Sequence, residues 1–347
     1  MIKTFALIAV SAIALAGCND QAGSSSASRD YISAVGSSTV YPFATTAAEE
    51  FVRANAGMKT PKIESTGTGG GMERFCQGVG AAYPDIEDAS RRMKKSEFDE
   101  CVKNNVKEIV EIQVGIDGIA IAQSVSGPKL TLTPEDLYKA LAANVDGQPN
   151  TAKTWKDVNP SLPAIGISVY GPPSTSGTYD AFKELILLKG CEADPKMKAI
   201  KETDKDGFEK SCTNLRSAPY YVEQGENDNL IIGKLAKNPN SVGIFGYSYL
   251  EENQDKIRGI SINNVAPEYA AIASGKYPGA RPLYIYIKKA HVGVIPGIKE
   301  YVAEFLKGAG EGGYLKAKGL ILSPPDVAAK ANATAAAMTT LDGAELK

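Results

Sequence analysis

Short apolar runs alternate with amphipathic segments along the chain. Short runs rich in β-branched residues are typical of strands, and segments with apolar residues every three or four positions are typical of helices. Their alternation predicts an α/β architecture. The expected strands cover residues 31–35, 62–65, 110–113, 118–122, 165–170, 242–245 and 283–287, and the expected helices cover 43–55, 72–77, 134–142, 179–188, 229–236 and 298–306.

A chain of 347 residues is longer than a single hydrophobic core usually accommodates, so two domains are expected. Gly115 and Gly118 interrupt one apolar run and would suit a crossing between two lobes, although a bulge in one sheet is the alternative. A second crossing is expected near residues 247–253, so that the first lobe is discontinuous. Lobe 1 then comprises residues 31–114 and 254–347, and lobe 2 comprises residues 115–253.

The first residues have the pattern of a secretory signal peptide. Lys3 precedes an apolar stretch that is too short to cross a bilayer as a finished helix. The box that ends at Cys18 is typical of bacterial lipoproteins, in which residues 1–17 are removed and the cysteine is lipidated. The alternative is an ordinary signal peptide in which Cys18 has no role. Residues 18–30, rich in Ser, Gly and Ala, are expected to form a flexible tether.

This N-terminal pattern predicts a location in the periplasm or at the cell surface, with a membrane anchor at Cys18. Secretion would place the four other cysteines in an oxidising compartment, where disulfides are expected. Pairing neighbours in sequence joins Cys76 to Cys101 and Cys191 to Cys212. No C-x-x-C motif occurs, so zinc and thioredoxin-like chemistry are unsupported, and we expect neither a metal nor a cofactor.

The charge and the motif content argue against two other classes of protein. The net charge of −2 provides no basic surface for nucleic acid, so a bound anion would have to be attracted by local geometry. His291 is the single histidine, no G-x-S-x-G elbow accompanies it, and no Walker A motif occurs. We therefore expect a binding protein and not an enzyme.

Three segments share one local pattern, in which a strand leads through a turn rich in Gly, Ser or Thr into a helix. They are residues 33–43, 65–75 and 170–182. A helix N-terminus presents unpaired N–H groups and about half a positive charge. Glycines let that backbone approach an anion closely, and hydroxyls add neutral donors. One such turn is more often a simple helix cap, but three in one chain predict a convergent oxyanion site.

The order of the motifs is more specific than any single one. G-S-S-T-V-Y-P, G-T-G-G-G, D-I-E-D-A-S-R, S-T-S-G-T and V-G-I-F-G-Y-S-Y follow one another over nearly the whole mature chain. In this order they resemble the periplasmic phosphate-binding proteins of Pst-type ABC transporters. The resemblance implies a two-lobed type II periplasmic binding protein fold, with a mixed sheet flanked by helices in each lobe and a hinge between them. It also implies a monomer that binds inorganic phosphate with high affinity and delivers it to the membrane permease subunits of an ABC importer.

The resemblance also implies which positions hold the phosphate. Ligands are expected from the first two turns in one lobe and from the third turn in the other. Carried over by position, they are Thr39, the Val40 amide, Thr68, Ser176, Gly177 and Thr178.

The sequence departs from the family pattern at two positions. Ser90 stands where many relatives have an aspartate that accepts the phosphate proton, and Pro172 stands where many have an arginine. We infer that Arg91 supplies the missing guanidinium next to Ser90, and the alternative is that Arg91 belongs to a solvated basic run. Asp88 and Asp228 are candidate proton acceptors, with solvent exposure and helix capping as their respective alternatives.

Two alternatives to phosphate delivery remain open at this point. The chain could bind another tetrahedral oxyanion, because the proton acceptor that separates phosphate from sulfate is not identified. It could also be a surface lipoprotein of the same fold that serves adhesion or signalling.

Overall fold

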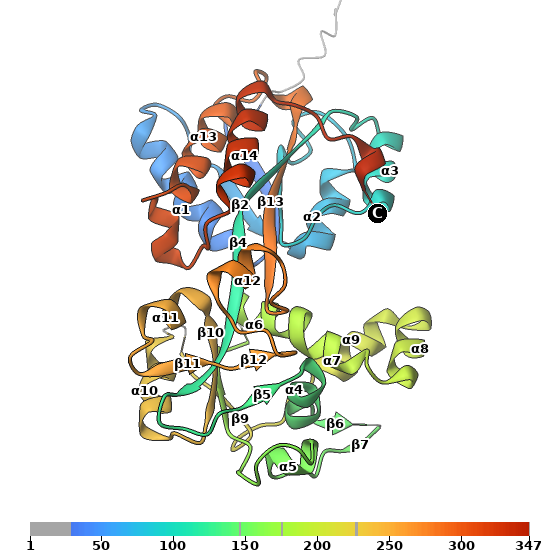
Figure 1. Cartoon of the computed structure of the whole chain (residues 1–347). Coiled ribbons are helices and arrows are strands. Elements are labelled where there is room, and N and C mark those ends of the chain that lie inside the picture. The colour runs from blue at the N-terminus through green and yellow to red at the C-terminus, as the bar shows by residue number, and fades with distance from the viewer. Residues whose placement is uncertain (1–28, 146, 175, 226–227, 347) are drawn as a thin grey trace, which may run out of the picture.

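The computed structural model describes residues 29–145, 147–174, 176–225 and 228–346. Cys18, the signal segment and most of the tether lie outside these residues. The described chain forms two lobes, each with a sheet and flanking helices, joined by long strands (Figure 1). The two-lobed α/β fold predicted from the sequence is therefore confirmed.

The first lobe is built on a mixed sheet with the strand order β2-β1-β3-β13-β4. Strand β1 is parallel to β2 and β3, whereas β13 is antiparallel to β3 and β4. Helices α1 and α13 bury apolar residues on one face, and α2 and α3 do so on the other (Figure 1). The elements are β1 (Ser33–Gly36), α1 (Tyr41–Ala54), β2 (Lys62–Ser65), α2 (Gly67–Phe75), β3 (Ile86–Ala89), α3 (Lys95–Lys103), β13 (Ala280–Lys288), α13 (Ile298–Ala309), α14 (Pro325–Ala337) and the 3₁₀ turns Lys289–His291, Tyr314–Lys318 and Gly343–Glu345.

The second lobe is built on a sheet with the order β4-β10-β8-β9, and β11 pairs with the far end of β4. Strand β8 is parallel to β9 and β10, and Trp155 and Phe182 are fully buried in the core beside this sheet. The elements are β5 (Thr131–Leu132), α4 (Pro134–Leu141), β6 (Asn144–Val145), β7 (Gln148–Pro149), α5 (Trp155–Val158), β8 (Val169–Gly171), α6 (Gly177–Phe182), the π-helical turn Lys183–Leu187, α7 (Leu188–Cys191), α8 (Pro195–Thr203), α9 (Lys205–Thr213), β9 (Tyr221–Glu223), α10 (Asn229–Lys237), β10 (Val242–Gly246), α11 (Tyr247–Glu252), β11 (Ile257–Gly259), β12 (Ser261–Ile262) and α12 (Tyr269–Ala273).

Strand β4 (Ile109–Ser124) carries the chain from one lobe to the other. Its first half pairs with β13, and its second half pairs with β10 and β11. Gly115 and Gly118 lie between the halves, and a Cβ on Gly115 would come within 2.6 Å of the Leu320 side chain. The pairing with β13 also shifts register next to Leu283. The glycines therefore mark a crossing that also contains an irregularity in the ladder, and the two expected strands in this region are one continuous strand.

The return to the first lobe follows a longer excursion. After α11, strand β11 still pairs with the second-lobe end of β4, and Tyr277 is fully buried in the second-lobe core. Strand β13 then pairs with β4 from Ala280 onward. The expected domain boundary at residue 253 remains a prediction. Because β11 and Tyr277 pack in the second lobe, we propose a later boundary, with the chain returning to the first lobe near residue 279.

Both expected disulfides are present. Cys76 and Cys101 join the end of α2 to α3, and Cys191 and Cys212 join α7 to α9. The bonded residues are 25 and 21 positions apart in sequence, respectively. Closing a loop of this length restricts the unfolded chain, which is worth about 3 kcal/mol of folding free energy in the chain-entropy model.

Replacing Cys191 and Cys212 together by alanine should lower the free energy of unfolding by about 3 kcal/mol. The cause is the regained freedom of the unfolded chain, because both side chains are buried among apolar neighbours that alanine still suits. Denaturant titration under non-reducing conditions measures the change, with the reduced wild-type chain as a comparison. An unchanged unfolding midpoint, or alkylation of all four cysteines in the unfolded, unreduced chain, would contradict the account.

Candidate functional site

The carboxyl ends of three parallel strands meet at one edge of the first-lobe sheet. Gly36 at the end of β1 is level with Ser65 of β2 and with Asp88 of β3. Hydrogen bonds continue the ladders past the strands, from the Thr66 amide to the Gly36 carbonyl at 2.8 Å and from the Ser37 amide to the Asp88 carbonyl at 2.7 Å. The turns that follow β1, β2 and β3 therefore lie side by side.

The first turn leads into α1. The Ser37 hydroxyl oxygen accepts from the Thr39 amide at 3.1 Å and from the Val40 amide at 3.4 Å. Pro42 occupies the first helical turn, where its missing N–H leaves no hydrogen bond unmade. The Val40 contact is long for an N–H···O bond, so this amide is held only weakly within the turn. Thr39 is buried, with 6% of its surface exposed.

The second turn is itself the start of α2, which begins at Gly67, earlier than the sequence predicted. The Thr68 hydroxyl oxygen accepts from the Ser90 amide at 3.1 Å, and the two hydroxyl oxygens are also 3.1 Å apart. Two of the predicted ligand residues from separate turns are thus in direct contact.

The third turn belongs to the second lobe and begins the helical segment that runs through α6 to α7. Ser176 caps α6, because its hydroxyl oxygen accepts from the Thr178 amide at 3.2 Å. Gly177 faces the first lobe, and a Cβ placed on it would lie 3.4 Å from the Thr39 Cα. The structure therefore brings the third turn against the first.

Two side-chain contacts also join the lobes here. The Ser38 hydroxyl donates to Asp180 Oδ2 at 2.8 Å. Arg281 on β13 donates from Nη2 to Thr39 Oγ1 at 2.9 Å, and its Nη1 pairs with Glu184 of the second lobe. Patterns in the sequence predicted no role for Arg281. In the sequence, Arg281 only precedes an apolar run. That position gives no indication that its side chain contacts Thr39, which is 242 residues away in the chain.

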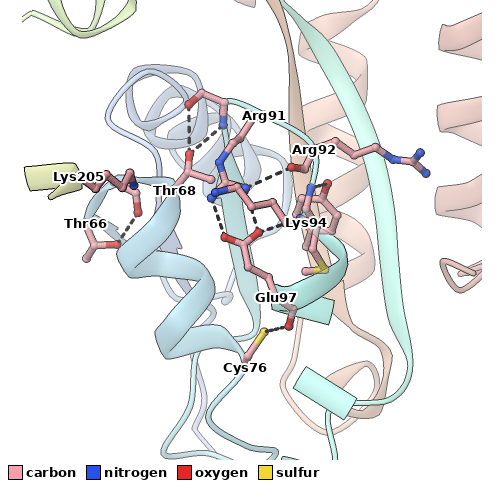
Figure 2. Close-up of polar contacts among 12 residues, drawn as sticks. Thr66, Thr68, Cys76, Arg91, Arg92, Lys94, Glu97 and Lys205 are labelled. Atoms are coloured by element: carbon pink, nitrogen blue, oxygen red, sulfur yellow. Dashed lines mark hydrogen bonds and ion pairs between the residues drawn. The ribbon is translucent and has the colours of Figure 1, made fainter. Parts of the chain in front are cut away.

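Arg91 extends from the turn that holds Ser90 toward Glu97 (Figure 2). Its two terminal nitrogens donate to the Glu97 carboxylate at 2.9 and 2.6 Å, and Nη1 also donates to the Arg92 carbonyl at 3.2 Å. The hydrogen bond with Glu97 raises the pKa of Arg91. The Nε–H and one Nη2–H have no partner among the described residues, so Arg91 keeps donors for a ligand and its binding role stays a prediction.

Two buried carboxyl groups lie behind the turns of the first lobe. Burial raises the pKa of Asp88 to about 7 and holds the pKa of Glu87 well above its ordinary value. Within the described chain, neither Glu87 oxygen has a hydrogen-bond partner, and Glu87 packs against Gly36. Asp88 is thus buried and does not face solvent. Asp228 directly precedes α10, but its side chain makes no capping hydrogen bond to that helix, and its carboxylate accepts from the Gly246 amide at 3.0 Å.

The histidine lies at the opposite edge of the first-lobe sheet. His291 Nδ1 is 2.6 Å from Asp85 Oδ1, and Nε2 accepts from the Gly80 amide at 2.9 Å. Asp85 in turn accepts from the amide of Ser33, at the start of β1. The Gly80 contact requires an unprotonated Nε2, so the ring donates its proton to Asp85 and fills a structural role there.

Known proteins are similar to this chain in sequence and fold. A family model described as the PBP superfamily domain matches residues 22–308. The chain is 31% identical over 298 residues to Protein SphX of Synechococcus elongatus, covering 82% of this chain and 76% of that protein. It is 29% identical over 282 residues to the phosphate-binding protein PstS of Staphylococcus saprophyticus, covering 80% of this chain and 76% of that protein.

A solved structure is similar over most of its length. The crystal structure of a possible phosphate binding protein from Planctomyces limnophilus superposes with a TM-score of 0.71 at 27% identity, covering 88% of this chain and 98% of that one. The chain therefore belongs to the PBP superfamily, as a member of the periplasmic phosphate-binding proteins of Pst-type ABC transporters.

Proposed function

We propose that this chain binds inorganic phosphate between its two lobes, outside the cytoplasmic membrane, and delivers it as a monomer to the permease subunits of an ABC importer. The observation that carries the proposal is the meeting of three hydroxyl-rich turns at helix N-termini, with Gly177 of one lobe against Thr39 of the other. The names of PstS and of the Planctomyces limnophilus protein support phosphate as the anion.

The chemistry of these turns suits an anion taken out of water. Helix N-termini and hydroxyls offer donors without requiring a full counter-charge for each ligand oxygen. Because donors come from both lobes, phosphate would stabilise the closed arrangement over any open one. The proposed ligands are Thr39, the Val40 amide, Thr68, Ser90, Arg91, Ser176, Gly177 and Thr178.

Removing one hydroxyl from each wall tests this site. Thr68→Val and Ser176→Ala should each weaken phosphate binding about tenfold or more, because a hydrogen bond to a charged group contributes about 1.5–3 kcal/mol. Calorimetry with phosphate measures the change, with sulfate as a competing oxyanion. Thr45→Val is a matched control, because its hydroxyl donates within α1 to the Tyr41 carbonyl.

Wild-type affinity in both hydroxyl variants would refute the ligand assignment while leaving the fold intact. Binding of sulfate or another tetrahedral oxyanion in preference to phosphate would instead support the first alternative function. A chain that binds no oxyanion would favour an adhesion or signalling role.

Arg91 is the proposed ligand most open to refutation. Arg91→Ala should cost about 2–5 kcal/mol of phosphate binding, and Arg91→Lys should also weaken it, because an ammonium cannot bond Glu97 and two ligand oxygens in the same plane. Arg92→Ala is the control, since Arg92 points to Glu111 and Glu345. If Arg91→Ala binds phosphate like the wild type, the Arg91 side chain serves only to hold Glu97 at the start of α3.

We further propose that lipidated Cys18 anchors the protein after removal of residues 1–17. The Leu15–Cys18 box supports this proposal. Arg29 donates to the carbonyls of Ala81 and Tyr83 and pairs with Asp85, at the edge of lobe 1 away from the proposed site, so a tether ending there leaves the site accessible. Over the ranges that the structure covers, no helix is long and apolar enough to cross a membrane.

Expression in a Gram-negative host tests the anchor. The wild-type protein should sediment with the membrane fraction, and Cys18→Ala should release it or block its maturation. The lipid supplies the membrane affinity, which needs more than one acyl chain to be stable. Equal recovery of both forms in the soluble fraction would refute lipid anchoring.

A further inference from the structure

The two strands that join the lobes carry a charged pair. Arg281 on β13 stands opposite Asp117 on β4, with 3.4 Å between Arg281 Nε and Asp117 Oδ2. Arg281 is 8% exposed, and burial raises the pKa of Asp117 although Arg281 opposes that shift. Neither atom of this contact forms a hydrogen bond with any described residue. The cost of desolvating such a pair offsets most of its electrostatic attraction, so the pair adds little to the stability of the fold. The importance of Arg281 therefore lies in the other groups that its guanidinium contacts.

The terminal nitrogens of Arg281 hold one group from each lobe. Nη2 donates to Thr39 Oγ1, and Nη1 pairs with the carboxylate of Glu184. A guanidinium can only donate, so the Thr39 oxygen accepts in this contact and its own proton must be donated elsewhere. No other hydrogen bond of this hydroxyl occurs within the described ranges. The backbone amide of Thr39 is already directed to Ser37.

The Thr39 proton is therefore available to a ligand between the lobes, next to Gly177. A hydroxyl that accepts from a charged donor is polarised and becomes a stronger donor itself. Such a hydroxyl suits an unprotonated anion oxygen.

We propose that Arg281 is a positioning residue, which orients the Thr39 hydroxyl toward the bound anion and, through Glu184, couples that orientation to closure of the lobes. The proposal rests on the proposed phosphate site and deepens it. Arg281 contacts Thr39 from β13, one of the two strands that join the lobes. Its contacts therefore depend on how the two lobes are placed relative to each other. When the second lobe moves away, Glu184 leaves and the guanidinium loses the contact that fixes its plane.

A double-mutant cycle separates this role from general structural support. Phosphate is titrated into the full chain carrying Arg281→Met, Thr39→Val, both, or neither. Arg281→Met should weaken binding by about tenfold or more in the wild-type background and by less than about twofold in the Thr39→Val background. Arg53→Met is the matched control, because it removes an exposed guanidinium of α1 that pairs only with Glu50 among the described residues, and it should leave the affinity unchanged.

Equal losses in the two backgrounds would overturn the proposal, as would wild-type affinity in Arg281→Met. A wild-type chain that binds no phosphate would overturn the proposed function as well, so the two failures are distinguishable. Removing Arg281 leaves Asp117 buried without its partner, which can prevent folding. If circular dichroism finds Arg281→Met unfolded, Arg281→Lys replaces it in the cycle, because it keeps a charge at Asp117 but cannot hold both other partners.

Glu184→Gln tests the coupling to closure with little risk to folding, because the Glu184 side chain is 55% exposed. Small-angle scattering of the ligand-free chain should give a larger radius of gyration than the wild type, and phosphate should bind about threefold or more weakly. Wild-type values of both quantities would overturn the part of the proposal that involves Glu184.

Discussion

Parallel pairing of β1 with β2 and β3 is the interaction on which the proposed site depends. It places three strand ends at one edge of the sheet, so the helices that follow β1 and β2 both direct their N-termini there. The crossing strands β4 and β13 then attach the second lobe next to that edge, where the turn after β8 meets the turn after β1. Without this register the turns after β1, β2 and β3 would lie apart, and their hydroxyls could not face one ligand.

The electrostatics of this edge are local. The chain as a whole carries a net charge of −2 and cannot attract an anion by bulk charge. Behind the turns, burial raises the pKa values of Glu87 and Asp88, which reduces the negative charge that would otherwise repel an anion. Two guanidinium groups flank the turns from different directions. Arg91 is held by Glu97, and Arg281 is held between Asp117 and Glu184.

Local patterns in the sequence predicted the lobes, the three turns, most of the principal helices and both disulfides. They failed for elements that lack the apolar pattern expected of a strand or a helix. Strand β3 contains two buried acidic residues and was not recognised as a strand, because its pattern lacks the apolar run of a central strand. The polar helices α8 and α9 were missed because almost none of their residues face the core.

The start of α2 and the role of Arg281 were missed for different reasons. Three consecutive glycines suggested a turn, yet α2 already begins at Gly67. Within the helix, Gly71 is required because a Cβ at this position would collide with the Glu87 side chain. Arg281 acquires its partners only when strands and helices from both lobes come together. Contacts between distant segments leave no periodic signal in a single sequence, and only the three-dimensional structure reveals them.

A crystal structure of the chain with phosphate tests the central claim most directly. The account predicts one anion between the lobes, within hydrogen-bond distance of the hydroxyls of Thr39, Thr68 and Ser176, so that both lobes bind it. An anion held by one lobe alone, or bound in the second-lobe cavity lined by Tyr179 and Arg216, would contradict the account.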